Sequence, residues 1–197
     1  MTPNRWAGVR MLQTAHRLNE RCFSLLAETV RTGGASIELH AMYRLRELWA
    51  QVDARVCERA GRCPVLLLDL NFQRADWWRW VGQGDGRASS VNVPSALFAV
   101  ERATPLLREI LMEAWSIGRS IPHAASLVFG MEPRVSSAIA DLSVPELDQV
   151  AVVYARYLRP RWEDSRVFWQ RLLLAAIGAD DEALAHAHLH CLQLLGS

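Results

Sequence analysis

The residues best suited to bind a metal ion lie near the C-terminus, where His186, His188 and His190 precede Cys191. On a helix, His186 and His190 share one face at four-residue spacing, and two histidines so placed can bind zinc. However, His188 then points away, and a zinc site needs three or four convergent ligands. Histidines near a helix C-terminus also interact favourably with the helix dipole without any metal. We therefore expect no metal and no cofactor, and His186 and His190 are the candidate ligands if a metal is bound.

The other polar motifs do not form a recognisable catalytic set. The glycine-rich stretch Gly82-Gln-Gly-Asp-Gly86 follows a tryptophan-rich segment and has no lysine after it, so it predicts a linker rather than a phosphate-binding loop. The histidines His16, His40 and His123 are isolated in the sequence, and no nucleophile can be paired with a base. The four cysteines lack zinc-ligand spacing. Because they are scattered along the chain, we expect a protein of the reducing cytoplasm. The sequence predicts that the protein is not an enzyme.

Three tryptophans stand close together at Trp77, Trp78 and Trp80. On a helix Trp77 and Trp80 share a side, whereas Trp78 diverges from it. One interpretation is that one side fills the core and the other packs on a neighbouring element. The other is a partner-binding surface, because tryptophan is enriched among the residues that dominate protein–protein interfaces. The sequence leaves these two interpretations open.

All 22 basic residues are arginines, and their distribution along the chain is uneven. Residues 1–62 hold ten arginines and six acidic residues, whereas residues 63–197 hold twelve arginines and fifteen acidic residues. The net charge of +1 is thus the sum of a basic first third and a mildly acidic remainder, which argues against a protein that coats nucleic acid by charge alone. In the first third, four arginines are placed as one stripe of a helix: Arg44, Arg55, Arg59 and Arg62.

The hydrophobic periodicity predicts an all-α protein, a multi-helix bundle of capped helical hairpins without a significant sheet. We expect a long helix ending at Gly33-Gly34, a second from Ser36 to Gly61, and a tryptophan-rich helix near 72–81. Further along, predicted helices begin at Ser95, Thr104-Pro105, Ser120, Glu132, Ser143, Asp164 or Ser165, and Asp180. The apolar run 65–70 has no strand partner in this interpretation and is expected to be a core segment.

These elements suggest two domains joined by a linker. We expect an N-terminal helical module over 1–82, a Gly/Ser linker over 83–93, and a C-terminal helical domain over 94–197. No stretch is long and apolar enough to predict a membrane span.

The stretch 120–142 is spaced as a helical hairpin that could present Arg134 and Ser136 to DNA. The segment from Ala125 to Ala151 resembles FlhD, a subunit of the bacterial flagellar transcription activator. The shared features are a small-residue helix ending in Gly130, an apolar helix ending in Ala140-Asp-Leu142, and the cap Ser143-Val-Pro-Glu146. The turn Leu158-Arg-Pro-Arg-Trp-Glu-Asp164 is similar to the aromatic and basic turn of the family, so that the resemblance covers about residues 105–175.

The resemblance implies a cytoplasmic bacterial transcription regulator that binds promoter DNA as a dimer or hetero-oligomer, without a membrane. In this hypothesis a protein partner reads most bases, while arginines position the phosphates. The expected DNA contacts are Arg134, Ser136, Arg156, Arg159 and Arg161. The alternative function is a helical adaptor or assembly protein of a secretion or motility system that binds protein only, through Trp77, Trp78 and Trp80.

Overall fold

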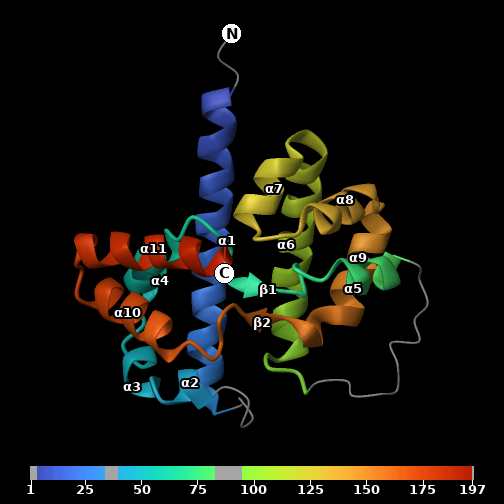
Figure 1. The fold of residues 1–197 in the computed structure, drawn as a ribbon. Helices are drawn as coiled ribbons and strands as arrows, with labels where there is room; N and C mark the ends of the chain where they lie inside the picture. Colours follow the sequence, from blue (N-terminus) through green and yellow to red (C-terminus); the bar gives the residue numbers. More distant parts are fainter. Residues whose placement is uncertain (1–3, 34–39, 83–94, 197) are drawn as a thin grey trace. The chain divides into compact units, whose positions relative to one another are not determined.

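The computed structural model describes residues 4–33, 40–82 and 95–196, and it confirms the all-α prediction. Within these residues the chain forms helices and one two-stranded sheet (Figure 1). It divides into unit 1, which combines Met1–Leu68 with Arg159–Ser197, and unit 2, Asp69–Leu158. None of the described helices combines the length and the apolar character needed to span a bilayer.

This division differs from the predicted domains 1–82 and 94–197. The tryptophan-rich helix packs with the helices of 100–157, and the C-terminal helices pack with the N-terminal ones. Periodicity identifies which face of a helix is apolar but not which helix covers it. The sequence therefore did not predict that the C-terminal helices join the N-terminal ones in unit 1. The predicted linker 83–93 lies outside the described residues.

Unit 1 is built around one long helix. Its elements are α1 (Asn4–Thr32), α2 (His40–Tyr43), α3 (Arg46–Trp49), α4 (Ala54–Gly61), β1 (Leu68–Asp69), β2 (Arg159–Pro160), α10 (Arg166–Ile177) and α11 (Asp181–Leu195). Helix α1 packs on α4, and α10 packs on both α11 and α4. The centre is aromatic, since the rings of Phe23, Trp49 and Trp169 lie 5.6 to 6.0 Å apart.

The predicted continuous helix from Ser36 to Gly61 is wrong, because the described part of this segment forms the short helices α2, α3 and α4. Asp53 is extended and accepts a hydrogen bond from the backbone N of Val56, and this N-cap starts α4 afresh. The predicted stripe of arginines is therefore not continuous, because Arg44 lies before α3 whereas Arg55 and Arg59 lie on α4. Arg59 donates to Asp181 at 2.9 Å, whereas Arg62 pairs with Glu58.

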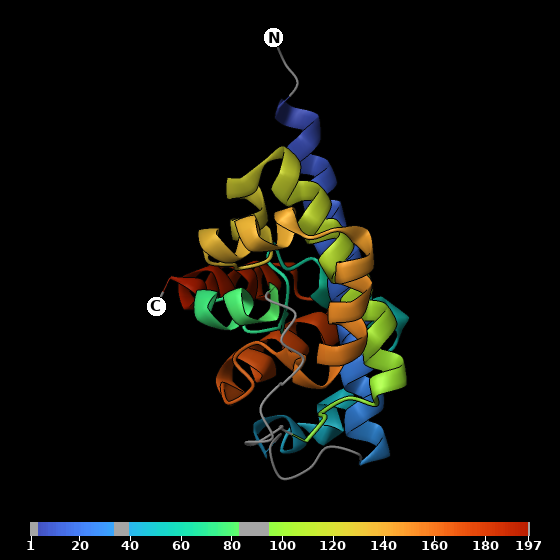
Figure 2. The same ribbon diagram turned by 90° about the vertical axis from the view of Figure 1, so that its right-hand side faces the viewer.

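Unit 2 surrounds a central helix with shorter ones. Its elements are α5 (Ala75–Gly82), α6 (Val100–Ser120), α7 (Pro122–Val128), α8 (Pro133–Asp141), α9 (Val144–Tyr154) and the 3-10 turn η2 (Ala155–Tyr157). Helices α7, α8 and α9 pack on α6, as Figure 2 shows. Helix α6 begins at Val100, not at the predicted Thr104-Pro105, and the Thr104 hydroxyl instead donates to the Val100 carbonyl within the helix.

Two predicted helix boundaries in unit 2 are confirmed by their local geometry. Gly130 has a φ of +54°, which glycine adopts without strain, and the chain turns there between α7 and α8. The Glu146 carboxylate accepts from the Ser143 backbone N at 2.7 Å, so the predicted cap starts α9. Hydrogen bonds from Ser143 lower the pKa of Glu146, since they favour its charged form.

The apolar run 65–70 does have a strand partner, contrary to the prediction. Strand β1 pairs with β2, which is only two residues long. A strand this short carries no periodicity that a sequence pattern could reveal.

Candidate functional site

The predicted DNA contacts Arg134 and Ser136 lie on α8 in different environments. Arg134 is in the first turn and exposed, so its guanidinium can reach a phosphate. Ser136 is only 2% exposed, and an added Cβ on Gly118 of α6 would meet its Oγ at 3.4 Å. The expectation that Ser136 contacts a base is therefore corrected, because its hydroxyl faces the α6–α8 interface.

The three arginines of the predicted turn also differ. Arg156 is exposed at η2 of unit 2, and Arg159 is half-buried in β2. Arg161 is only 6% exposed, and its Nε donates to the Leu66 carbonyl at 2.9 Å. Its backbone N donates to the Leu67 carbonyl at 2.8 Å. Arg161 thus holds the segment before β1 inside unit 1, which corrects the expectation of a phosphate contact.

The tryptophan-rich helix α5 agrees with the first of the two interpretations, since one side lies in the core and the other packs on α9. Trp78 is 1% exposed and stacks on Phe72 at 5.9 Å, so it belongs to the core. Trp77 and Trp80 are half-buried, and their rings lie 5.1 and 6.0 Å from the ring of Tyr154 on α9. Tyr157 adds a fourth ring, 6.0 Å from Trp77. We call Trp77, Trp80, Tyr154 and Tyr157 the aromatic cluster.

A cleft of about 110 Å³ lies beside the aromatic cluster, between α5 and α9. Tyr154 lines this cleft with apolar residues of both helices, among them Val81, Val150 and Val153. Val153 is 41% exposed, which leaves apolar surface next to the half-buried rings. Burial and the neighbouring Tyr157 raise the pKa of Tyr154, so its hydroxyl stays neutral and can serve as a hydrogen-bond donor. The tyrosine partners come from a distant segment, and the spacing of the tryptophans alone could not reveal them.

The candidate metal ligands His186 and His190 line one groove of unit 1, between α10 and α11. Its volume is about 680 Å³, and Arg171, Leu174 and Asp180 line it with them. Among the described residues no group of three His, Cys, Asp or Glu side chains could hold a metal ion. Within the part of the chain that the structure describes, His186 and His190 line this groove together but belong to no group of three candidate ligands.

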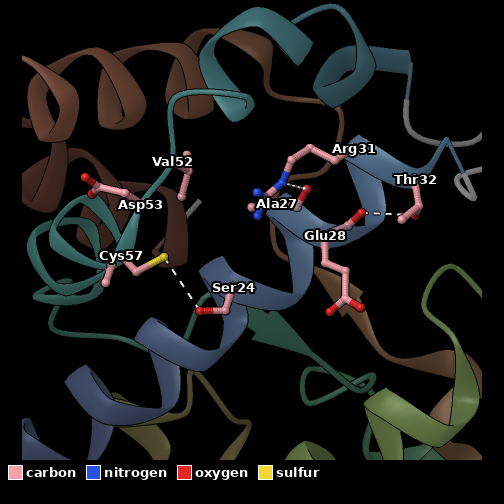
Figure 3. A pocket seen from close by; sticks show the side chains of 9 residues that line it. Ser24, Ala27, Glu28, Arg31, Thr32, Val52, Asp53 and Cys57 are labelled. Atoms are coloured by element: carbon pink, nitrogen blue, oxygen red, sulfur yellow. Dashed lines mark hydrogen bonds between the residues drawn. The ribbon is translucent and has the colours of Figure 1, made fainter.

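A second groove of unit 1, of about 660 Å³, lies between α1 and α4 (Figure 3). Figure 3 shows Ser24 of α1 and Cys57 of α4 turned toward each other, with Ser24 Oγ donating to Cys57 Sγ at 3.6 Å. Arg31 is held by its own helix, since its Nε donates to the Ala27 carbonyl at 3.0 Å. Burial raises the pKa of the Cys57 thiol, which favours its protonated form.

The polar centre of unit 1 is Asn19, a residue that the sequence patterns did not single out. It is fully buried, and its Nδ2 donates to the carbonyls of Cys63 at 3.1 Å and Val65 at 2.8 Å. Its Oδ1 accepts from the Leu67 backbone N at 2.8 Å. One amide side chain therefore satisfies the irregular segment that follows α4.

Comparisons of the chain with protein-family models, curated proteins and solved structures found no match.

Proposed function

We propose that the protein is a subunit of a bacterial transcription regulator of FlhD type, an activator that binds promoter DNA together with a protein partner. The observation that carries this proposal is the exposed first turn of α8, which follows α7 after the turn at Gly130. The helix order α6, α7, α8 and α9, with Gly130 and the Ser143–Glu146 cap at the turns, agrees with the segment on which the resemblance rests.

The proposed phosphate contacts of unit 2 are Arg134 and Arg156, which are both exposed. Arg159, half-buried in unit 1, is a separate candidate. A cation in the first turn of a helix gains nothing from the helix dipole, so the position of Arg134 favours a role toward an anion. A phosphate there would meet the guanidinium and the backbone N–H of Arg134, since Pro133 has no N–H and the backbone N–H groups of Val135 and Ser136 donate to the Glu132 carbonyl.

The same surface supports the need for a partner. The exposed face of α8 carries Arg134, Ser137 and the acidic Asp141, which offers few groups for reading bases. A second subunit, in a homodimer or a hetero-oligomer, would supply the base contacts. The proposal places this complex in the cytoplasm and requires no catalytic activity.

Gel shifts with genomic promoter fragments, with and without co-expressed products of neighbouring genes, test the proposal. We expect the double substitution Arg134→Ala and Arg156→Ala to weaken binding and to reduce the dependence of log K on log salt by roughly two, since two phosphate contacts are lost. Arg108→Ala is the matched control, because Arg108 is exposed in the same unit but paired with Asp148. An absence of DNA binding with the partner present, or an unchanged salt slope in the double variant, would contradict the proposal.

The second candidate function is a helical adaptor that binds protein only, and the aromatic cluster favours it. Half-buried tryptophan rings packed on a tyrosine and lying beside exposed valine are typical of the centre of a protein interface. In this hypothesis Trp80→Ala abolishes capture of the partner in a pull-down, while no DNA fragment is shifted. Trp78→Ala is unsuitable for this test because Trp78 lies in the core. Leu127→Ala, an exposed apolar residue on α7, is the control.

A further inference from the structure

Cys63 and Cys191 are far apart in the sequence but meet inside unit 1. Their Sγ atoms are 3.0 Å apart, and 128 positions separate them along the chain. A disulfide has a sulfur–sulfur distance of about 2.05 Å, so the two sulfurs need to approach by only about one ångström to bond. Both side chains are fully buried.

Neighbouring groups hold each sulfur in place. Cys63 lies in the segment anchored by Asn19, which binds the Cys63 carbonyl. The Cys191 Sγ donates to the His188 carbonyl at 2.8 Å, one turn earlier in α11. Because the thiol proton of Cys191 is used in the hydrogen bond to the His188 carbonyl, the thiol of Cys63 is the donor to the sulfur of Cys191. This chain of hydrogen bonds aims the sulfur of Cys63 at that of Cys191.

The other two cysteines have different surroundings. Cys57 lines the groove of Figure 3 and receives a hydrogen bond from Ser24. Cys22 is fully buried on α1. These two residues provide internal standards for any oxidation of the closely placed pair.

We propose that Cys63 and Cys191 form a reversible disulfide that responds to hydroperoxides and fastens α11 to the segment after α4. A hydroperoxide first transfers an oxygen atom to one sulfur, giving a sulfenic acid and releasing the alcohol, or water from hydrogen peroxide. The second thiol then attacks that sulfur, and the hydroxyl group leaves as water. In sum, two S–H bonds and the O–O bond are broken, one S–S bond is formed, and the peroxide takes up two electrons and two protons.

The position of Cys191 determines how the oxidant enters. Cys191 lies one turn before the end of α11 at Leu195, and the last turn of a helix opens more readily than its centre. Burial raises the pKa of Cys63, so attack on the closed pair is slow and opening of this last turn limits the rate. Once Cys191 is oxidised to a sulfenic acid, closing of the last turn of α11 places its sulfur beside Cys63, and the disulfide forms before a second oxidant molecule can react.

The disulfide would change the stability of unit 1. It closes a loop of more than a hundred residues, which removes conformational freedom from the unfolded chain. For a chain of this size, we expect the melting temperature to rise on the order of 10 °C. The state of this pair would thereby set how tightly α11 is held, independently of whether the protein binds DNA.

The test is to treat the full chain with hydrogen peroxide, block free thiols under denaturing conditions, and map peptides by mass spectrometry. We expect one internal disulfide that joins the peptides containing Cys63 and Cys191, with Cys22 and Cys57 alkylated, and dithiothreitol should reverse both the bond and the rise in melting temperature. Cys57→Ser should retain these results, and Cys191→Ala should lose them. A Cys22–Cys57 disulfide, irreversible oxidation of Cys191, or a pair that stays reduced while Cys57 is oxidised would overturn the proposal. The disulfide is mapped in the chain without substitutions, so its detection does not depend on whether Cys191→Ala folds.

Discussion

The two units of this protein are stabilised by different kinds of interaction. In unit 1, the irregular segment between α4 and β1 is held by buried polar side chains, namely Asn19 and Arg161. In unit 2, the shorter helices α7, α8 and α9 pack on α6, and Ser136 of α8 is buried near Gly118 of α6. Buried polar groups tolerate little change, because an unpaired partner left in the interior is costly. Unit 1 should therefore be the more sensitive of the two to single substitutions.

The largest effect is expected for Asn19→Ala. The substitution removes the side chain that binds the backbone of Cys63, Val65 and Leu67, and it leaves those buried groups unsatisfied. We expect the free energy of unfolding to fall by about 3–5 kcal/mol, measured by urea denaturation followed by tryptophan fluorescence. Ser24→Ala on the same helix is the control, with an expected change below about 0.5 kcal/mol. Equal losses of unfolding free energy for Asn19→Ala and Ser24→Ala would contradict the view that buried polar side chains stabilise unit 1.

One pair of glycine substitutions compares the units directly. A Cβ added at Gly61 in unit 1 would meet Glu20 Cγ at 2.8 Å and the His16 carbonyl at 3.1 Å, so Gly61→Ala should cost about 2 kcal/mol. A Cβ at Gly118 in unit 2 would meet its nearest neighbour at 3.4 Å, a distance of ordinary contact. Gly118→Ala should therefore be neutral or stabilising, by up to about 1 kcal/mol, through its higher helix propensity. Thermal denaturation of both variants tests this order, and the reverse order would contradict it.

A smaller effect is expected from acid, and it should act on unit 1. Burial lowers the pKa of His188 from 6.5 to about 4, with a further contribution from the nearby His16. Between these two pH values the unfolded chain binds a proton that the folded chain does not, so stability falls as the pH decreases from 6.5 to about 4. Because the side chain is partly exposed, we expect the loss to be about 1–2 kcal/mol.

His188→Asn tests the origin of this acid sensitivity. Asparagine keeps a donor near the Ala60 backbone but does not titrate, so the variant should lose less stability below pH 6.5. Above pH 7 the stability curves of the two proteins should run parallel. Identical slopes below pH 6.5 would show that another group causes the acid sensitivity.

The smallest effect is expected for the ion pair on unit 2, where Arg108 Nε lies 2.6 Å from the Asp148 carboxylate. Both side chains are nearly half exposed, at 46% and 47%, and such pairs contribute little in water. A double-mutant cycle with Arg108→Ala and Asp148→Ala should give a coupling of about 0.5 kcal/mol that disappears at high salt. A coupling above about 2 kcal/mol would mean that unit 2 also depends on polar pairs.

The amino-acid sequence by itself determined the helical class and most helix boundaries. The signals are local. The Ser143–Glu146 cap and the Asp180 N-cap of α11 each involve residues within one turn, and the end of α1 coincides with Gly33. The break at Asp53 was also encoded locally, but the apolar stripe through Trp49 and Val52 concealed it.

Only the tertiary structure decided which surfaces are buried and which residues meet. The sequence placed Ser136 and Arg161 among exposed contacts, whereas neighbours far along the chain bury them. The partnership of Trp77 with Tyr154 and that of Cys63 with Cys191 likewise join distant segments. A periodic pattern identifies only the apolar face of one helix. Which side chains cover that face depends on how the whole chain packs.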